Sequence, residues 1–112
     1  METFEGELWQ CPDCGPKFDH TKVKDWKCST CNDPIWIAAE VNGNNYVLER
    51  IKAKEIQKED VILLDGMHNG EEVKKVKQFG KKIRIYLRNN PAITQPAGTF
   101  LNIIIGNWQN RD

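Results

Sequence analysis

Residues 11–31 read CPDCGPKFDHTKVKDWKCSTC and contain all four cysteines of the 112-residue chain. They form two Cys-x-x-Cys pairs, Cys11 with Cys14 and Cys28 with Cys31, separated by thirteen residues. Such pairs could form disulfides, act as a redox dithiol or bind a metal ion. A thioredoxin-like site uses one pair in a βαβ setting, whereas two pairs near this spacing are typical of four-cysteine zinc sites. We therefore expect one structural Zn²⁺ per chain.

The residues around the two pairs suit a metal site. Gly15 can adopt the positive φ that such a turn often needs, and Asn32 tolerates left-handed geometry after the second pair. Trp9 and Trp26 each lie two residues before a pair, where strand residues could pack around a metal. Four thiolates leave no coordination position for water, which argues against catalytic zinc. His20 lies between the pairs and could replace one of the cysteine ligands, but we expect His20 to be a surface loop residue.

The segments WQCPDCG (residues 9–15) and WKCSTCN (residues 26–32) resemble the zinc ribbon family. The resemblance covers residues 8 to about 41 and implies Cys11, Cys14, Cys28 and Cys31 as the four ligands. Zinc ribbons bind nucleic acids, contact proteins or only stabilise a fold, so family membership does not choose among these functions.

The remaining residues predict short strands joined by turns. Period-two patterning and β-branched residues support five strand segments. These segments are Ile35–Val41, Tyr46–Ile51, Val61–Leu64, residues 82–88 and Thr99–Ile105. Asn42-Gly43 predicts one hairpin turn, and Gly80 with Lys81 predicts a second. Residues 71–79 also suit a short helix that Gly80 would end, but we favour a strand because it completes the second hairpin.

The segment IKAKEIQKEDVILLDG (residues 51–66) and the hairpin after it resemble small SH3-like, KOW-type barrels. We therefore predict an all-β protein, with a zinc ribbon (residues 1–42) joined to a small antiparallel SH3-like β-barrel (residues 43–112). The two parts could also form one continuous folding unit. Self-splicing domains have a similar sequence pattern, but they need a nucleophile at the start of the domain and His-Asn near its end. Here His68-Asn69 falls mid-chain, and no Cys, Ser or Thr begins the segment. Ser29 is the single serine and no catalytic motif is present, so we expect no enzyme.

The charge is unevenly distributed although the net charge is zero. Residues 1–73 carry fifteen Asp and Glu against eight Lys and Arg, and residues 74–112 carry eight Lys and Arg against Asp112. The candidate binding residues are Lys74, Lys75, Lys77, Lys81, Lys82, Arg84, Tyr86 and Arg88. If Ile83, Ile85 and Leu87 face the core, a cationic outer face with an aromatic ring suits nucleic acid. Lysines that protect a strand edge from aggregation would give the same pattern.

Two partner hypotheses remain open. One is RNA or single-stranded DNA on the basic hairpin. The other is a protein, for which Trp36 and Trp108 are candidate anchors because interfaces favour tryptophan. The apolar runs are too short to cross a bilayer, and Glu2, Glu5 and Glu7 stand where a secretory leader would be basic. We therefore expect a cytoplasmic, intracellular binding module with no membrane partner and no small-molecule substrate.

Overall fold

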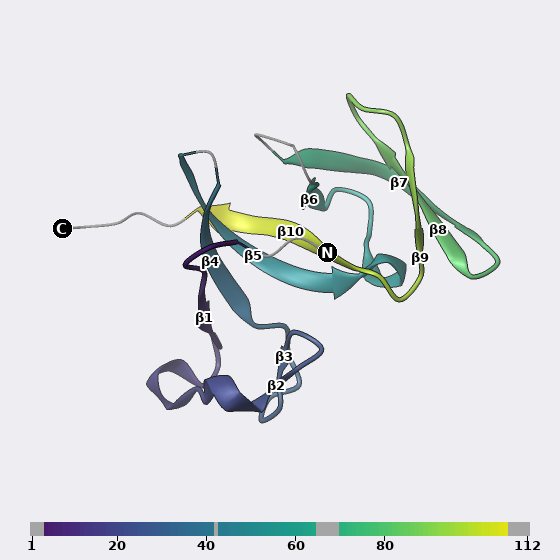
Figure 1. The fold of residues 1–112 in the computed structure, drawn as a ribbon. Helices are drawn as coiled ribbons and strands as arrows, with labels where there is room; N and C mark the ends of the chain where they lie inside the picture. The colour runs from purple at the N-terminus through teal and green to yellow at the C-terminus, as the bar shows by residue number, and fades with distance from the viewer. Residues whose placement is uncertain (1–3, 42, 65–69, 108–112) are drawn as a thin grey trace.

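The computed structural model describes residues 4–41, 43–64 and 70–107. Its main element is an eight-stranded antiparallel sheet with the order β1-β4-β5-β10-β6-β7-β8-β9 (Figure 1). The strands are β1 Leu8–Gln10, β4 Trp36–Val41, β5 Asn44–Lys52, β6 Val61–Leu63, β7 Glu71–Phe79, β8 Lys82–Leu87, β9 Ile93–Pro96 and β10 Phe100–Asn107. A second sheet pairs β2 Val23–Lys24 with β3 Lys27–Cys28. The all-β prediction is confirmed.

Three-residue 3-10 turns connect some of these strands: η1 Gly15–Lys17, η2 His20–Lys22 and η3 Ala53–Glu55. No helix in the described part of the chain is long and apolar enough to cross a membrane. The pair His68-Asn69 and the predicted anchor Trp108 lie in residues 65–69 and 108–112, outside the described residues.

Both predicted hairpins are confirmed. β4 pairs with β5 up to Val41 opposite Asn44, and β7 pairs with β8 up to Phe79 opposite Lys82. Gly80 takes a φ of +58° in the second turn, a conformation that a residue without a Cβ adopts at low cost. Residues 71–79 are strand and not helix, because they pair with β8: Val73 lies opposite Leu87 and Val76 opposite Ile85, with a register shift between Val73 and Lys75.

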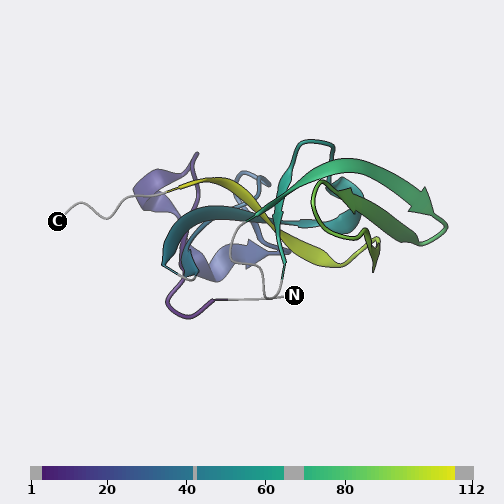
Figure 2. The ribbon, with the colours of Figure 1, turned by 90° about the horizontal axis from the view of Figure 1, so that it is seen from above.

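The central strands carry an apolar core on each face. On β10, Leu101 and Ile103 belong to one core, while Ile104 packs against the other. On β6, Ile62 and Leu63 divide in the same way, as period-two alternation requires. The first core contains the buried apolar residues of β7 and β8. The second contains those of the cysteine region, which we define as residues 8–35. Figures 1 and 2 show these two regions at opposite ends of the molecule.

The predicted closed barrel is wrong: within the described residues the sheet is open, and its order ends at β1 and β9. β10 lies between β5 and β6, so the last strand fills the middle of the sheet instead of closing its edges. β9 ends at Pro96, which has no N–H to donate to a further strand, and proline is typical of edge strands.

The predicted boundary at residue 42 lies inside the β4–β5 hairpin. Five residue pairs join these strands across it, from Ile37 with Leu48 to Val41 with Asn44. The sheet is therefore continuous from the cysteine region to β9. Whether residues 1–42 and 43–112 fold separately stays a prediction.

Candidate metal centre and cationic face

The four cysteine sulfurs form one cluster, with all Sγ atoms within 4.8 Å of one another. Sγ–Sγ distances are 3.8 Å for Cys11 and Cys31, 3.7 Å for Cys14 and Cys28, and 3.2 Å for Cys14 and Cys31. Sulfurs about 2.3 Å from a tetrahedral zinc would lie about 3.8 Å apart. None of the four forms a disulfide. The cluster could therefore hold a metal ion.

Two similar turns present the cysteines. The Gly15 amide donates to the Cys11 carbonyl at 3.0 Å, and the Asn32 amide donates to the Cys28 carbonyl at 2.7 Å. Gly15 has a φ of +56° and Asn32 a φ of +60°, as their residue types predicted. The two turns thus have the same geometry. In each, a residue suited to left-handed backbone directly follows the second cysteine of the pair.

Backbone amides stabilise negative charge on the sulfurs. The Cys14 amide donates to Cys11 Sγ at 3.4 Å. The Cys31 amide, with that of Thr30, lowers the pKa of the Cys28 thiol to about 7, although desolvation opposes the change. A hydrogen bond with Cys14 raises the pKa of Cys31. A metal binds the thiolate form of cysteine, and the two amides favour that form at Cys28.

The aromatic neighbours of the cluster lie as predicted, and the histidine is outside it. Trp9 and Trp26 meet edge to face with ring centroids 5.3 Å apart and pack against the core that contains Cys11 and Cys28. His20 Nε2 lies 3.0 Å from the Trp9 carbonyl oxygen, and His20 is not a member of the four-sulfur group. The described residues therefore offer the metal a site of four thiols.

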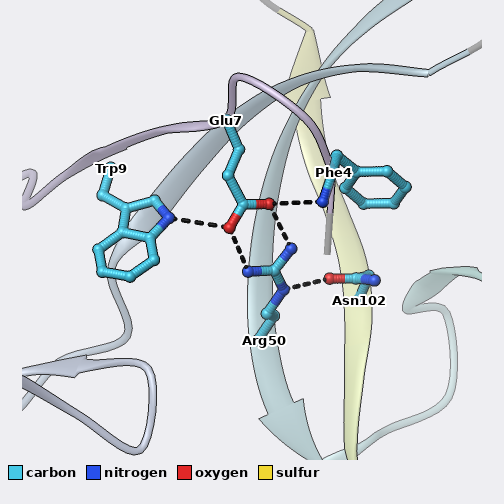
Figure 3. Close-up of polar contacts among 5 residues, drawn as sticks. All are labelled: Phe4, Glu7, Trp9, Arg50 and Asn102. Carbon is cyan, nitrogen blue, oxygen red and sulfur yellow. Dashed lines mark hydrogen bonds and ion pairs between the residues drawn. The ribbon is translucent and has the colours of Figure 1, made fainter. Parts of the chain in front are cut away.

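A buried arginine joins the cysteine region to the sheet (Figure 3). The guanidinium of Arg50 on β5 donates to both carboxylate oxygens of Glu7, at 2.7 and 2.6 Å, and its Nε donates to Asn102 on β10 at 2.7 Å. The Arg50 side chain is 0% exposed and that of Glu7 10%. The guanidinium also lies 4.4 Å from the ring centroid of Trp26.

Glu7 also makes hydrogen bonds within the N-terminal segment. It accepts hydrogen bonds from the Trp9 indole and from the Phe4 amide, both at 3.0 Å (Figure 3). Burial raises the pKa of Glu7, but the bonds from Arg50, Trp9 and Phe4 outweigh burial, so the pKa is lowered. The folded protein therefore favours the ionised form of the Glu7 carboxylate.

The pairing of Arg50 with Glu7 was not predicted from the sequence. Arg50 follows Tyr46 and Leu48 at period two, so its position on the buried face of β5 was visible in the alternation. A cation at such a position needs a buried partner, but the sequence does not show which of many acids supplies it.

The candidate binding residues lie on the β7–β8 hairpin as the patterning predicted. Ile83, Ile85 and Leu87 are buried, whereas the alternating cations Lys82, Arg84 and Arg88 are exposed. Direct cross-strand pairs place six side chains on one outer face, which we call the cationic face. It consists of Lys75, Lys77 and Phe79 on β7 and Lys82, Arg84 and Tyr86 on β8.

The other three candidate residues lie around this face. Lys74 is at the register shift of β7, Lys81 is in the turn, and Arg88 forms an ion pair with Glu72 at 2.8 Å. Tyr86 is half-buried, with Lys75 Nζ 5.5 Å and the Arg84 guanidinium 5.7 Å from its ring centroid. Phe79 is 47% exposed, so the face also presents an open aromatic surface.

Comparison with known proteins adds no assignment, because no family model, no curated protein and no solved structure matches the chain.

Proposed function

We propose that the protein is a zinc ribbon module without catalytic activity that binds single-stranded RNA or DNA on its cationic face. Cys11, Cys14, Cys28 and Cys31 would hold one Zn²⁺, because four thiolates in two Cys-x-x-Cys turns suit zinc and leave no open position. The zinc is structural: it stabilises the cysteine region, while the opposite end of the sheet contacts the ligand.

The main observation that supports nucleic-acid binding is the direct pairing of like charges on the β7–β8 hairpin. Lys77 lies opposite Arg84, and Lys82 is two residues from Arg84 on the same face. Like charges directly opposite one another destabilise a sheet, so local stability does not explain this arrangement. A row of phosphates would neutralise these charges and release counterions on binding.

The aromatic rings of the face support a single strand over a duplex. Phe79 and Tyr86 lie among the cations, and Phe79 has Lys77 Nζ 5.3 Å from its ring centroid. Unpaired bases stack on such rings whatever their sequence, whereas the bases of a duplex are stacked on one another. We expect binding with little sequence preference.

Filter binding of a labelled oligonucleotide over a range of salt concentrations tests the proposal. Four phosphate contacts predict a slope of about −3 in log K against log salt, at about 0.7 per contact. The variant Lys77→Gln/Arg84→Gln should reduce this slope by about 1.4 while unfolding at the same temperature or higher, because a like-charge pair is removed.

The matched control is Lys17→Gln/Lys58→Gln, which removes two exposed positive charges elsewhere. It should leave the slope nearly unchanged. Absence of binding to single- or double-stranded nucleic acid at about 50 mM salt, where exposed charges are screened less than at physiological strength, would refute the proposal.

A protein partner is the second candidate function, and a separate surface favours it. Leu8 on β1 is 66% exposed, and Trp36 on β4 is 37% exposed. They lie on one face, because Leu8 is opposite Ala38 and Gln10 is opposite Trp36. Recovery of one protein from nuclease-treated lysate, lost in Leu8→Ser but kept in Lys77→Gln/Arg84→Gln, would support this function.

A further inference from the structure

A groove lies where the cysteine region meets the sheet. It has a volume of about 530 Å³. Lys24, Lys27 and Ser29 from the β2–β3 hairpin line one side, and Lys52, Lys54 and Phe100 line the other. None of these residues belongs to the cationic face of β7 and β8.

The charge of this groove is positive. Four lysines line it, against the two carboxylates of Asp25 and Glu55. Glu55 is already held, because it accepts a hydrogen bond from the Lys52 amide at 3.1 Å and lies 3.9 Å from Lys27 Nζ. The lysines therefore exceed the acids on both walls, and an anionic ligand would meet cations from two sides.

An aromatic hollow continues the groove. Its volume is about 320 Å³, and Trp9, His20 and Trp26 line it together with Phe100 and Asp25, which also line the groove. Phe100 is the aromatic ring that lines both hollows, whereas Trp26 already has the Arg50 guanidinium over its ring. Lys52 Nζ lies 5.8 Å from the Phe100 ring centroid.

We infer that this groove is a second nucleic-acid site, in which lysines from both walls contact backbone phosphates and Phe100 stacks a base. Cations that follow a groove, with an aromatic ring among them, are the elements of a single-strand site. The inference goes beyond the function proposed for the cationic face, since it uses different residues, from the β2–β3 hairpin, β5, η3 and β10.

The test is a titration of the ¹⁵N-labelled, zinc-loaded full chain with the tetranucleotide (dT)₄ at about 50 mM salt, followed by amide NMR. We expect the signals of Lys24–Ser29, Lys52–Glu55 and Phe100 to shift, in the wild type and equally in Lys77→Gln/Arg84→Gln. The affinity is obtained from these shifts at several salt concentrations. Lys24→Gln/Lys54→Gln should reduce the slope of log K against log salt by about 1.4.

Phe100→Leu keeps an apolar side chain and should weaken the tetranucleotide about tenfold if the ring stacks a base. Tripolyphosphate, an anion without bases, should bind the groove more weakly than (dT)₄ and equally in Phe100→Leu and the wild type. Equal binding of both probes, with no effect of Phe100→Leu, would overturn the inference and leave an unspecific anion surface.

The two sites can fail separately. Shifts confined to residues 74–88 would overturn the groove and keep the proposed function of the cationic face. Shifts confined to the groove would refute the cationic face and support the groove. Lys17→Gln/Lys58→Gln serves as the charge control for both and should behave as the wild type.

Discussion

The cysteine region and the β7–β8 hairpin are organised by different chemistry. In the hairpin and its neighbours, Val73, Ile83 and Ile85 are almost fully buried and fill a core of aliphatic side chains. In the cysteine region the strands have two or three residues, and its most buried residues are Ile35, Cys11 and Cys28. The core of the first region consists of aliphatic side chains, whereas the core of the second includes thiols of a possible metal site.

Removal of the metal should give the largest effect and separate the two regions. Structural zinc contributes about 10–16 kcal/mol in finger peptides, comparable with the whole stability of about 5–15 kcal/mol of a typical domain. We expect chelation, or Cys28→Ser, to abolish amide exchange protection in residues 8–35. Amides of β7 and β8 should stay more protected, as hydrogen exchange by NMR would show.

Two controls make this comparison sharper. Thr30→Ala changes an exposed side chain in the same turn and keeps the amide that faces Cys28, so the metal should remain bound. Ile85→Ala should destabilise the opposite region by about 2–5 kcal/mol and leave metal binding intact. Equal loss of protection in both regions on chelation would show that the chain unfolds as one unit.

The ion pair of Arg50 with Glu7 should give the next largest effect, because both charged side chains are almost fully buried. Glu7→Gln leaves a buried guanidinium without its negative partner, which costs about 3–5 kcal/mol. Urea unfolding followed by tryptophan fluorescence measures this loss. Glu5→Gln, at an exposed position two residues away, is the control and should change stability little.

A double-mutant cycle separates the pair from its parts. Glu7→Leu/Arg50→Met replaces both charges with apolar groups and should be less destabilising than Glu7→Gln alone, because no uncompensated charge is buried. A double variant as unstable as the sum of the single ones would show that Arg50 and Glu7 act independently.

The pH dependence of this pair should be smaller but of definite sign. The pKa of Glu7 is lowered from 4.5 in the folded state. Its contribution to stability is therefore present above pH 4.5 and is lost as the pH falls through the folded-state pKa. The difference in unfolding free energy between wild type and Glu7→Gln should narrow between pH 6 and pH 3. A constant difference would contradict the assigned ionic state.

Local features of this fold were predictable because short stretches determine them. Gly15 and Asn32 permit the left-handed backbone after each cysteine pair, and Gly80 marks the turn of the second hairpin. The buried positions Ile83, Ile85 and Leu87 followed from strict alternation. In each case the relevant partner lies within a few residues along the chain.

Long-range features were not predictable in the same way. The open sheet follows from the position of β10 between β5 and β6, a pairing that joins residues about fifty positions apart. The partnership of Arg50 with Glu7 spans 43 residues. Neither pairing has a local pattern, since several acids and several strands of similar composition could have taken these places.

Native mass spectrometry of the reduced, zinc-loaded protein tests the central claim most directly, which is that four thiolates at one end hold a metal. We predict one Zn²⁺ per chain in the wild type and in Thr30→Ala, and none in Cys28→Ser. A reduced wild-type chain that stays metal-free in the presence of zinc, or a Cys28→Ser chain that still binds one equivalent as tightly, would contradict the account.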